Sequence, residues 1–226
     1  IYLVEEYIRG RTLRDLMRGG KPELKLAAGK TRLICEALDA LHRENVVHRD
    51  IKPENIMLRD PEGTPVLVDL GLAHLAGSDQ GFDAAAILGT PAYMAPEQYE
   101  AAPGNPKMDM YALGAILYEW LVGSHPIELV GGERRPRPIA PSELRSRLEK
   151  ATPACPELPA LCLQLLDPEP QRRPSARTAG SLCEQALSSL EGGSVLRFDC
   201  PTTSWLMPGV PENLAGPLVT DETQIL

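Results

Sequence analysis

The sequence predicts a mainly α-helical fold with a small β component, and three observations support this prediction. Residues 23–45 repeat apolar side chains every three or four positions, which is the period of an amphipathic helix. Residues 108–122, MDMYALGAILYEWLV, are apolar on nearly every side, as is typical of a helix buried at the centre of a domain. Two short apolar runs, at 55–59 and 65–70, flank the turn-forming stretch DPEGTP and predict one β-hairpin.

The remaining elements follow in chain order. Residues 1–8, IYLVEEYI, predict an edge strand that ends in a turn at residues 9–11. Thr12 is placed to cap a short helix over 13–19, and residues 157–166 and 175–190 predict two more helices, the last capped by Ser175. Residues 71–94 predict a long loop, residues 133–141 a connection broken by prolines, and residues from 192 onward a tail.

Composition limits the class of protein. The chain has 226 residues, is 43% hydrophobic and carries a formal net charge of −8, which argues against binding to nucleic acid. Five cysteines without CxxC spacing predict free thiols in a reducing compartment, and therefore a cytoplasmic protein. There is no signal peptide and no apolar run long enough to span a membrane. The first residue, Ile1, lies within a predicted strand, so we expect a fragment that lacks its N-terminal part.

The stretch VVHRDIKPENIML, at 46–58, places an acid, a cation and a carboxamide between two apolar flanks. Phosphoryl transfer needs such groups, because Asp50 can accept a hydroxyl proton, Lys52 can contact the phosphate and Asn55 can bind Mg²⁺. A second metal ligand is expected on the next strand, where VDLG supplies Asp69. The spacing therefore predicts a phosphoryl-transfer site.

These motifs resemble those of serine/threonine protein kinases, in the style of bacterial eukaryotic-like (Hanks-type) kinases. HRDIKPEN resembles the catalytic loop, DLG at 69–71 the metal-binding motif, and GTPAYMAPE at 89–97 the end of the activation segment. Residues 3–17, 109–126 and 165–176 resemble the hinge, the central helix and a later segment. The resemblance implies an α+β kinase fold that is truncated, with the last N-lobe strand and hinge at 1–10, the C-terminal lobe at 11–190 and a flexible tail at 191–226.

The resemblance also implies roles for individual residues. Asp50 is similar to the catalytic base, Lys52 to the lysine that contacts phosphate, and Thr90 to the threonine that shapes the acceptor site. Asn55 and Asp69 are similar to the ligands of Mg²⁺ (or Mn²⁺). For ATP, the resemblance implies backbone contacts from two hinge residues and a pocket floor from one side chain: Glu6, Ile8 and Met57.

Further positions are implied to be structural or regulatory. His48 and Leu70 would stack in the hydrophobic spine, with Leu70 standing where the family usually has Phe, next to Gly71. Asp109 would hold the backbone of the catalytic loop, Glu97 would pair with Arg173, and Arg49 would meet a phosphate on the activation segment. That phosphate is expected on Ser78 or Thr90, unless an aspartate replaces it. Thr223 resembles a phosphothreonine read by FHA domains; the alternative is an unstructured linker.

The 226 residues contain no glycine-rich GxGxxG loop and no VAIK-type lysine, both of which cover ATP in this family. We therefore expect the isolated chain to have negligible activity and the parent protein to be an active kinase that phosphorylates protein substrates. The alternative is a pseudokinase-like scaffold that binds protein partners. The intact set of polar residues in the loop favours the enzyme.

Overall fold

The computed structural model describes residues 6–70, 74–75, 90–100, 102–128 and 137–192, and every structural statement below concerns these residues. The chain divides into two compact units, residues 1–194 and 195–226, and the second lies outside the described residues. The expectations for residues 1–5, for most of the loop at 71–94 and for the tail from 193 onward therefore stay predictions.

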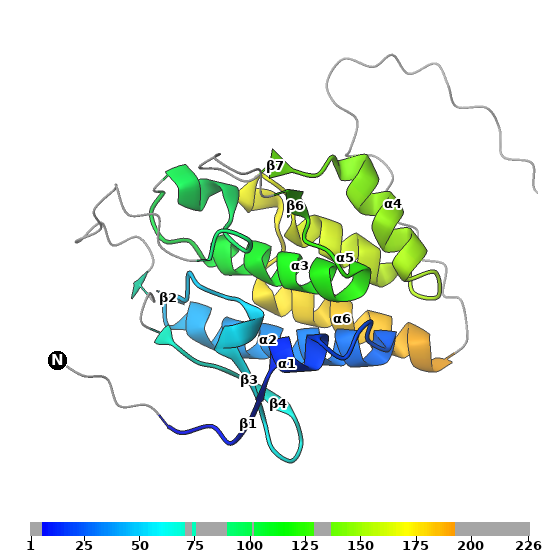
Figure 1. Ribbon diagram of the computed structural model, residues 1–226. Helices are drawn as coiled ribbons and strands as arrows, with labels where there is room; N and C mark the ends of the chain where they lie inside the picture. The colour runs from blue at the N-terminus through cyan, green and yellow to red at the C-terminus, as the bar shows by residue number, and fades with distance from the viewer. Residues whose placement is uncertain (1–5, 71–73, 76–89, 101, 129–136, 193–226) are drawn as a thin grey trace, which may run out of the picture. The chain divides into compact units, whose positions relative to one another are not determined.

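The described chain is mainly helical, as the sequence predicts. Its α-helices are α1 (Leu13–Met17), α2 (Leu24–Arg43), α3 (Pro106–Val122), α4 (Pro141–Ala151), α5 (Glu157–Leu165) and α6 (Ala176–Gly192). Helix α2 packs along α6, and α3 packs against α4 and α5 (Figure 1). None of the described helices is long and apolar enough to cross a membrane.

Helix α3 lies in the core of this unit, and its buried residues continue around all of its sides. It begins where Asn105 accepts a hydrogen bond from the Lys107 amide (2.9 Å) and where Pro106 suits the first turn. Gly114 lets α3 approach α5 closely, because a Cβ there would lie 2.7 Å from the Cβ of Leu165. The predicted central helix is confirmed.

Three small antiparallel sheets accompany the described helices. The largest has the order β1-β3-β4, with β1 (Gly10–Thr12), β3 (Ile56–Arg59) and β4 (Thr64–Leu67), so the predicted hairpin is confirmed. The other two pair β2 (Val46–Val47) with β5 (His74–Leu75), and β6 (Ile127–Glu128) with β7 (Arg137–Pro138). Ile56 and Leu58 point into the core, and Met57 between them points to the opposite, half-exposed face.

The first strand differs from the prediction. Residues 6–9 have no regular structure, and a strand occupies residues 10–12, where the sequence predicts a turn. The reason is a close approach: a Cβ on Gly10 would lie 1.9 Å from the carbonyl oxygen of Leu58, so only glycine lets β1 pair with β3 here. The glycine that indicates a turn in the sequence serves strand pairing in the fold.

Several other elements were not predicted, among them one helix and one strand pairing that matter for the packing of the core and of the loop. Helix α4 follows the proline-broken connection, with Pro141 in its first turn and Leu144 and Leu148 buried one turn apart. Strand β5 lies within the segment predicted as a loop, and its backbone pairs with Val46 and Val47. The other predicted helices, α1, α2, α5 and α6, are confirmed, and Ser175 caps α6 by accepting a hydrogen bond from the Thr178 amide (3.2 Å).

Candidate active site

The loop between β2 and β3 is anchored at both ends. Asp109, which is buried on α3, accepts hydrogen bonds from the backbone amides of His48 (3.0 Å) and Arg49 (2.9 Å). At the other end, the Val68 amide donates to the carbonyl of Asn55 (3.0 Å), which ties the loop to the end of β4. The segment between these anchors includes a short 3₁₀ helix, η1 (Pro53–Asn55), and is therefore held against the core.

Asp50 is the centre of a compact polar cluster. One carboxylate oxygen accepts from the Lys52 ammonium (2.7 Å) and from the Asn55 amide nitrogen (3.0 Å). The other accepts from the backbone amide (3.0 Å) and the hydroxyl (3.2 Å) of Thr90, and Lys52 also donates to that hydroxyl (3.1 Å). The four residues predicted to perform catalysis thus lie together, although Thr90 is 40 residues from Asp50 in the chain.

Two residues of this region adopt left-handed backbone conformations: Arg49 has φ 66° and Asp69 has φ 64°. Such strain costs a non-glycine residue about 1–3 kcal/mol and persists only where the surroundings impose it. For Arg49 the bond from its amide to Asp109 is one such constraint. One strained residue, Arg49, directly precedes Asp50, and the other, Asp69, is the predicted metal ligand.

The residues present fit a Mg²⁺ or Mn²⁺ ion. Asn55 is buried, and its amide nitrogen is held by Asp50, so its carbonyl oxygen is the end left for a cation. Asp69 is exposed and follows Val68, whose amide bonds to Asn55. Among the described residues no three His, Cys, Asp or Glu gather as a metal site. A site with only a few oxygen ligands from the protein suits such an ion, because the ion keeps water and phosphate oxygens as its other ligands.

The predicted ATP-binding residues lie beside the three-stranded sheet. Ile8 is buried, and Met57 stands half-exposed on the face of β3 that points away from the core. The carboxylate of Glu6 pairs with Arg59 (3.0 Å), which leaves its predicted adenine contact to the backbone. Tyr7 is 89% exposed. Met57 therefore leaves part of an apolar side chain accessible on this face of the sheet, and the adenine contacts stay a prediction.

The stacking of Leu70 with His48 in the hydrophobic spine stays a prediction. Leu70 is 39% exposed, whereas its expected neighbour His48 is fully buried and its ring nitrogen lies 3.1 Å from the carbonyl of Val68. Gly71 lies outside the described residues.

Arg173 and Glu97 form a buried, two-pronged ion pair. The guanidinium donates to both carboxylate oxygens of Glu97 (2.6 and 2.9 Å), and the arginine side chain has no exposed surface. It also donates to three backbone carbonyls and lies over the ring of Tyr111, 4.9 Å from its centroid. The pair joins the segment after Thr90 to the connection between α5 and α6.

The predicted phosphorylation sites are only partly described. Ser78 and Thr223 lie outside the described residues, and Thr90 is occupied with Asp50 and Lys52. Burial lowers the pKa of Arg49, partly offset by the charge of Asp109. Its guanidinium lies against Gly104, where a Cβ would come within 2.5 Å. The role of Arg49 in binding a phosphate stays a prediction.

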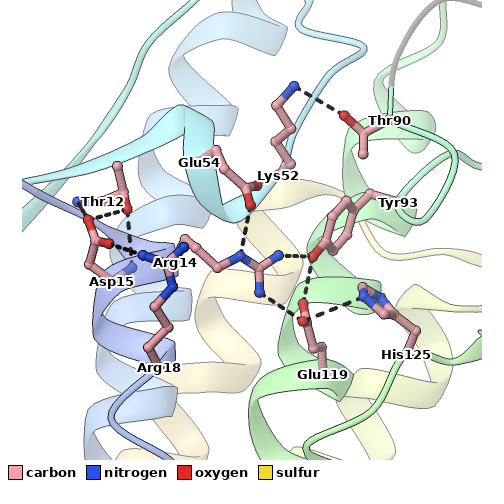
Figure 2. A network of polar contacts seen from close by, with 10 residues as sticks. All are labelled: Thr12, Arg14, Asp15, Arg18, Lys52, Glu54, Thr90, Tyr93, Glu119 and His125. Carbon is pink, nitrogen blue, oxygen red and sulfur yellow. Dashed lines mark hydrogen bonds and ion pairs between the residues drawn. The ribbon is translucent and has the colours of Figure 1, made fainter.

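Sequence reasoning missed a second polar network beside the first. In this network five side chains converge next to Lys52 and Thr90 (Figure 2). They are Arg14, Glu54, Tyr93, Glu119 and His125. Glu54 belongs to the HRDIKPEN motif and Tyr93 to GTPAYMAPE, and these two motifs are the signals that could have drawn attention to the network. The other members are far apart in sequence. Two supporting contacts were also missed: His42 lies 2.9 Å from Asp109, and Gln98 donates to the carbonyl of Arg49 (3.1 Å).

The chain is similar to known protein kinases. Residues 1–186 match the family of protein kinase domains. A probable serine/threonine-protein kinase of Streptomyces coelicolor is 36% identical over 186 residues, which cover 76% of this chain and 26% of the relative. Serine/threonine-protein kinase PknB of Mycobacterium leprae is 32% identical over 184 residues, covering 76% and 28%. PknL of Mycobacterium tuberculosis is 40% identical over 127 residues, covering 55% and 31%.

The matched regions span between a quarter and a third of the length of these relatives. Within that span, the family match includes the anchored loop, the Asp50 cluster and the Glu97–Arg173 pair described above. The relatives are bacterial, and their names agree on serine/threonine specificity. The chain therefore belongs to the protein kinase family, in its bacterial Hanks-type serine/threonine branch.

Proposed function

We propose that this chain carries the catalytic residues of a protein kinase that transfers a phosphoryl group from ATP to serine or threonine hydroxyls of protein substrates. The observation that carries the proposal is the cluster of Asp50, Lys52 and Thr90, in which one carboxylate is held by bonds to both of its oxygens. Folding alone does not require this arrangement, because a polar cluster costs more to bury than an apolar one. The names of the bacterial relatives support the same activity.

In this mechanism Asp50 orients the acceptor hydroxyl and takes up its proton as the oxygen bonds to phosphorus. Lys52, already bonded to Asp50 and Thr90, contacts the transferring phosphate, and Thr90 keeps the carboxylate in place. When bound, ATP would supply the phosphoryl group and leave as ADP once the bond to the transferred phosphorus breaks, and a Mg²⁺ or Mn²⁺ ion would neutralise charge on the phosphates. Asn55 and Asp69 would hold the ion, while Glu6, Ile8 and Met57 would contact the adenine.

Replacing Asp50 tests the proposal in the full-length protein, with Mg-ATP and casein as the phosphate acceptor. Asp50→Asn removes the proton acceptor but keeps the shape, so we expect kcat to fall by about 10²–10⁴-fold. Asp39→Asn is the matched control, because Asp39 pairs with Arg43 on α2, away from the site, and we expect it to leave kcat unchanged.

The same assay separates the enzyme from the scaffold. A full-length protein that transfers no phosphate from Mg-ATP would contradict the proposal and favour the pseudokinase-like scaffold. Phosphate transfer that does not depend on Asp50 would contradict the role proposed for Asp50. We expect the isolated 226-residue chain to transfer negligible phosphate, because it contains no glycine-rich loop or VAIK-type lysine to hold ATP. Detectable phosphate transfer by that chain would refute this second expectation.

The partners proposed are protein substrates and, for the tail, an FHA-domain reader of phospho-Thr223. The motif VTDETQIL carries the second proposal, since an acidic flank and a following apolar residue accompany the threonine. A peptide of residues 216–226 phosphorylated at Thr223 should bind an isolated FHA domain. Equal binding of the unmodified peptide would exclude this reader.

A further inference from the structure

Arg14 joins three parts of the fold through one guanidinium (Figure 2). Its Nε donates to Glu54 on η1 (2.8 Å), and one terminal nitrogen donates to Glu119 on α3 (2.8 Å). The other terminal nitrogen donates to the hydroxyl of Tyr93. These partners lie 40, 105 and 79 residues from Arg14, so the contacts exist only in the folded chain.

Two of these partners adjoin the catalytic cluster. Glu54 is the middle residue of η1, directly before Asn55 and two positions after Lys52. The Tyr93 amide donates to the carbonyl of Thr90 (2.9 Å), which closes the turn that presents Thr90 to Asp50. Arg14 therefore contacts both η1 and the turn at Thr90, the two segments that come together in the Asp50 cluster.

The protonation states of Arg14 and Tyr93 determine the direction of the hydrogen bonds in this network. Burial alone would lower the pKa of Arg14, but hydrogen bonds to Glu119 and Glu54 outweigh it and raise the pKa, so the guanidinium stays charged. Burial raises the pKa of Tyr93, and its bond to Glu119 raises it further, so the hydroxyl stays protonated. It can thus donate to Glu119 (2.6 Å) while it accepts from Arg14, and the three side chains form a closed triangle.

Helix α1 does not need Arg14 for its own formation. Thr12 and Asp15 form a complete capping box, in which each side chain bonds the other residue's backbone. Arg18, one turn after Arg14, pairs with Asp15 (2.8 Å) and is largely exposed. Arg18 therefore interacts within its own helix. The long-range contacts of Arg14, by contrast, are not needed to form α1.

We propose that Arg14 is a positioning residue for phosphoryl transfer, which holds η1 and the Thr90 turn in one frame so that Asp50, Lys52 and Thr90 meet. The proposal rests on the proposed kinase function for its effect on rate, whereas its effect on geometry is independent of activity. A charged fork that bonds three acceptors fixes both distance and angle. Loss of that fork would let the Thr90 turn move relative to Asp50.

Hydrogen exchange of the 226-residue chain tests the geometry without any assay of activity. In Arg14→Ala we expect the Thr90 amide, which donates to Asp50, to exchange about tenfold faster, as loss of one charge-assisted bond would allow. Arg18→Ala is the matched control and should leave this amide unchanged. Faster exchange confined to Thr90 and η1 supports positioning, while equal acceleration in α3 would show a purely structural role and overturn the proposal.

Kinetics of the full-length protein with casein test the effect on catalysis. We expect Arg14→Ala to lower kcat by about 10–100-fold with little change in the KM for ATP, because misplacement affects the reacting groups rather than nucleotide binding. Arg14→Lys should recover part of the rate, since one ammonium replaces part of the fork. Glu119→Gln keeps the size of the side chain but removes its charge. Its kcat therefore tests the contact between Arg14 and Glu119 even if the alanine variant fails to fold.

The outcomes separate this inference from the proposed function. An active wild type with equal kcat in Arg14→Ala and Arg18→Ala would overturn the positioning role and leave the kinase proposal intact. An inactive wild type would count against the kinase proposal, and the exchange of the Thr90 amide would still decide whether Arg14 positions that turn.

Discussion

At the scale of single residues, buried charge concentrates where segments far apart in sequence must meet. The Arg173 side chain has no exposed surface, yet each of its bonds reaches a carboxylate or a carbonyl. Asp109 is similarly buried, and its two oxygens accept bonds from the amides that start the catalytic loop. Charges of this kind are tolerated because every partner is present, and removing one partner leaves the other uncompensated.

Arg173→Ala should therefore destabilise the chain strongly. It leaves the carboxylate of Glu97 buried without its partner, and we expect the free energy of unfolding in urea to fall by about 3–5 kcal/mol. Arg177→Ala is the control, because Arg177 is largely exposed and lies 3.4 Å from Asp39, so its loss should cost less than about 1 kcal/mol. Similar losses in the two variants would contradict a stabilising role for the buried pair.

At the scale of elements, glycines decide where backbones can touch. Gly10 sits where β1 crosses the backbone of Leu58, and Gly114 sits where α3 meets Leu165. By contrast Gly29 lies within α2 with open space around it. Identical residues thus have opposite effects: two are required by close packing, and the third weakens the helix that contains it.

Gly10→Ala and Gly29→Ala should shift stability in opposite directions. At position 10 the new Cβ would lie 1.9 Å from a backbone oxygen that cannot rotate away, so we expect a loss of about 1–3 kcal/mol and weaker β1–β3 pairing. At position 29 alanine should add about 0.5–1 kcal/mol, because it favours the helix. Urea unfolding measures both; a neutral Gly10→Ala would mean that β1 does not need this close approach.

At the scale of the whole molecule, burial raises the pKa of several thiols and phenols among the described residues. Burial raises the pKa of Cys155 from 9.0 to about 11 and that of Tyr111 from 10.0 to about 12. The four described cysteines are all buried. Because the native state keeps the protons of Cys155 and Tyr111 longer than the unfolded state, their contribution to stability is complete below the unfolded pKa values and is lost as pH rises through the folded ones.

Stability should therefore decline between about pH 9 and pH 12. Urea midpoints measured at pH 7.5 and at pH 10.5 should differ, with the lower midpoint at alkaline pH. Cys155→Ser removes one of the titrating groups and keeps the bond to Glu157 possible, so its midpoint should fall less steeply. A wild-type midpoint that stays constant over this range would contradict the prediction.

Local chemistry is the reason that much of the site could be predicted. Asp50, Lys52 and Asn55 lie within six residues, so their spacing alone indicates phosphoryl transfer, and the resemblance extends this to Thr90 and Asp69. The helix at 106–122 was predictable because a long segment that is apolar on every side is stable only when it is buried. Helix α4 was not, because only Leu144 and Leu148 mark its buried face and its position depends on α3 and α5.

By itself, the sequence determined the family, the chemistry of the Asp50 loop and most helices, because each depends on residues that are neighbours in the chain. Only the tertiary structure decided two other matters: that Gly10 serves a strand, and that Arg14 ties η1 to the Thr90 turn. Each depends on partners tens of residues away, and the distance between such partners is set by packing, which no local pattern encodes.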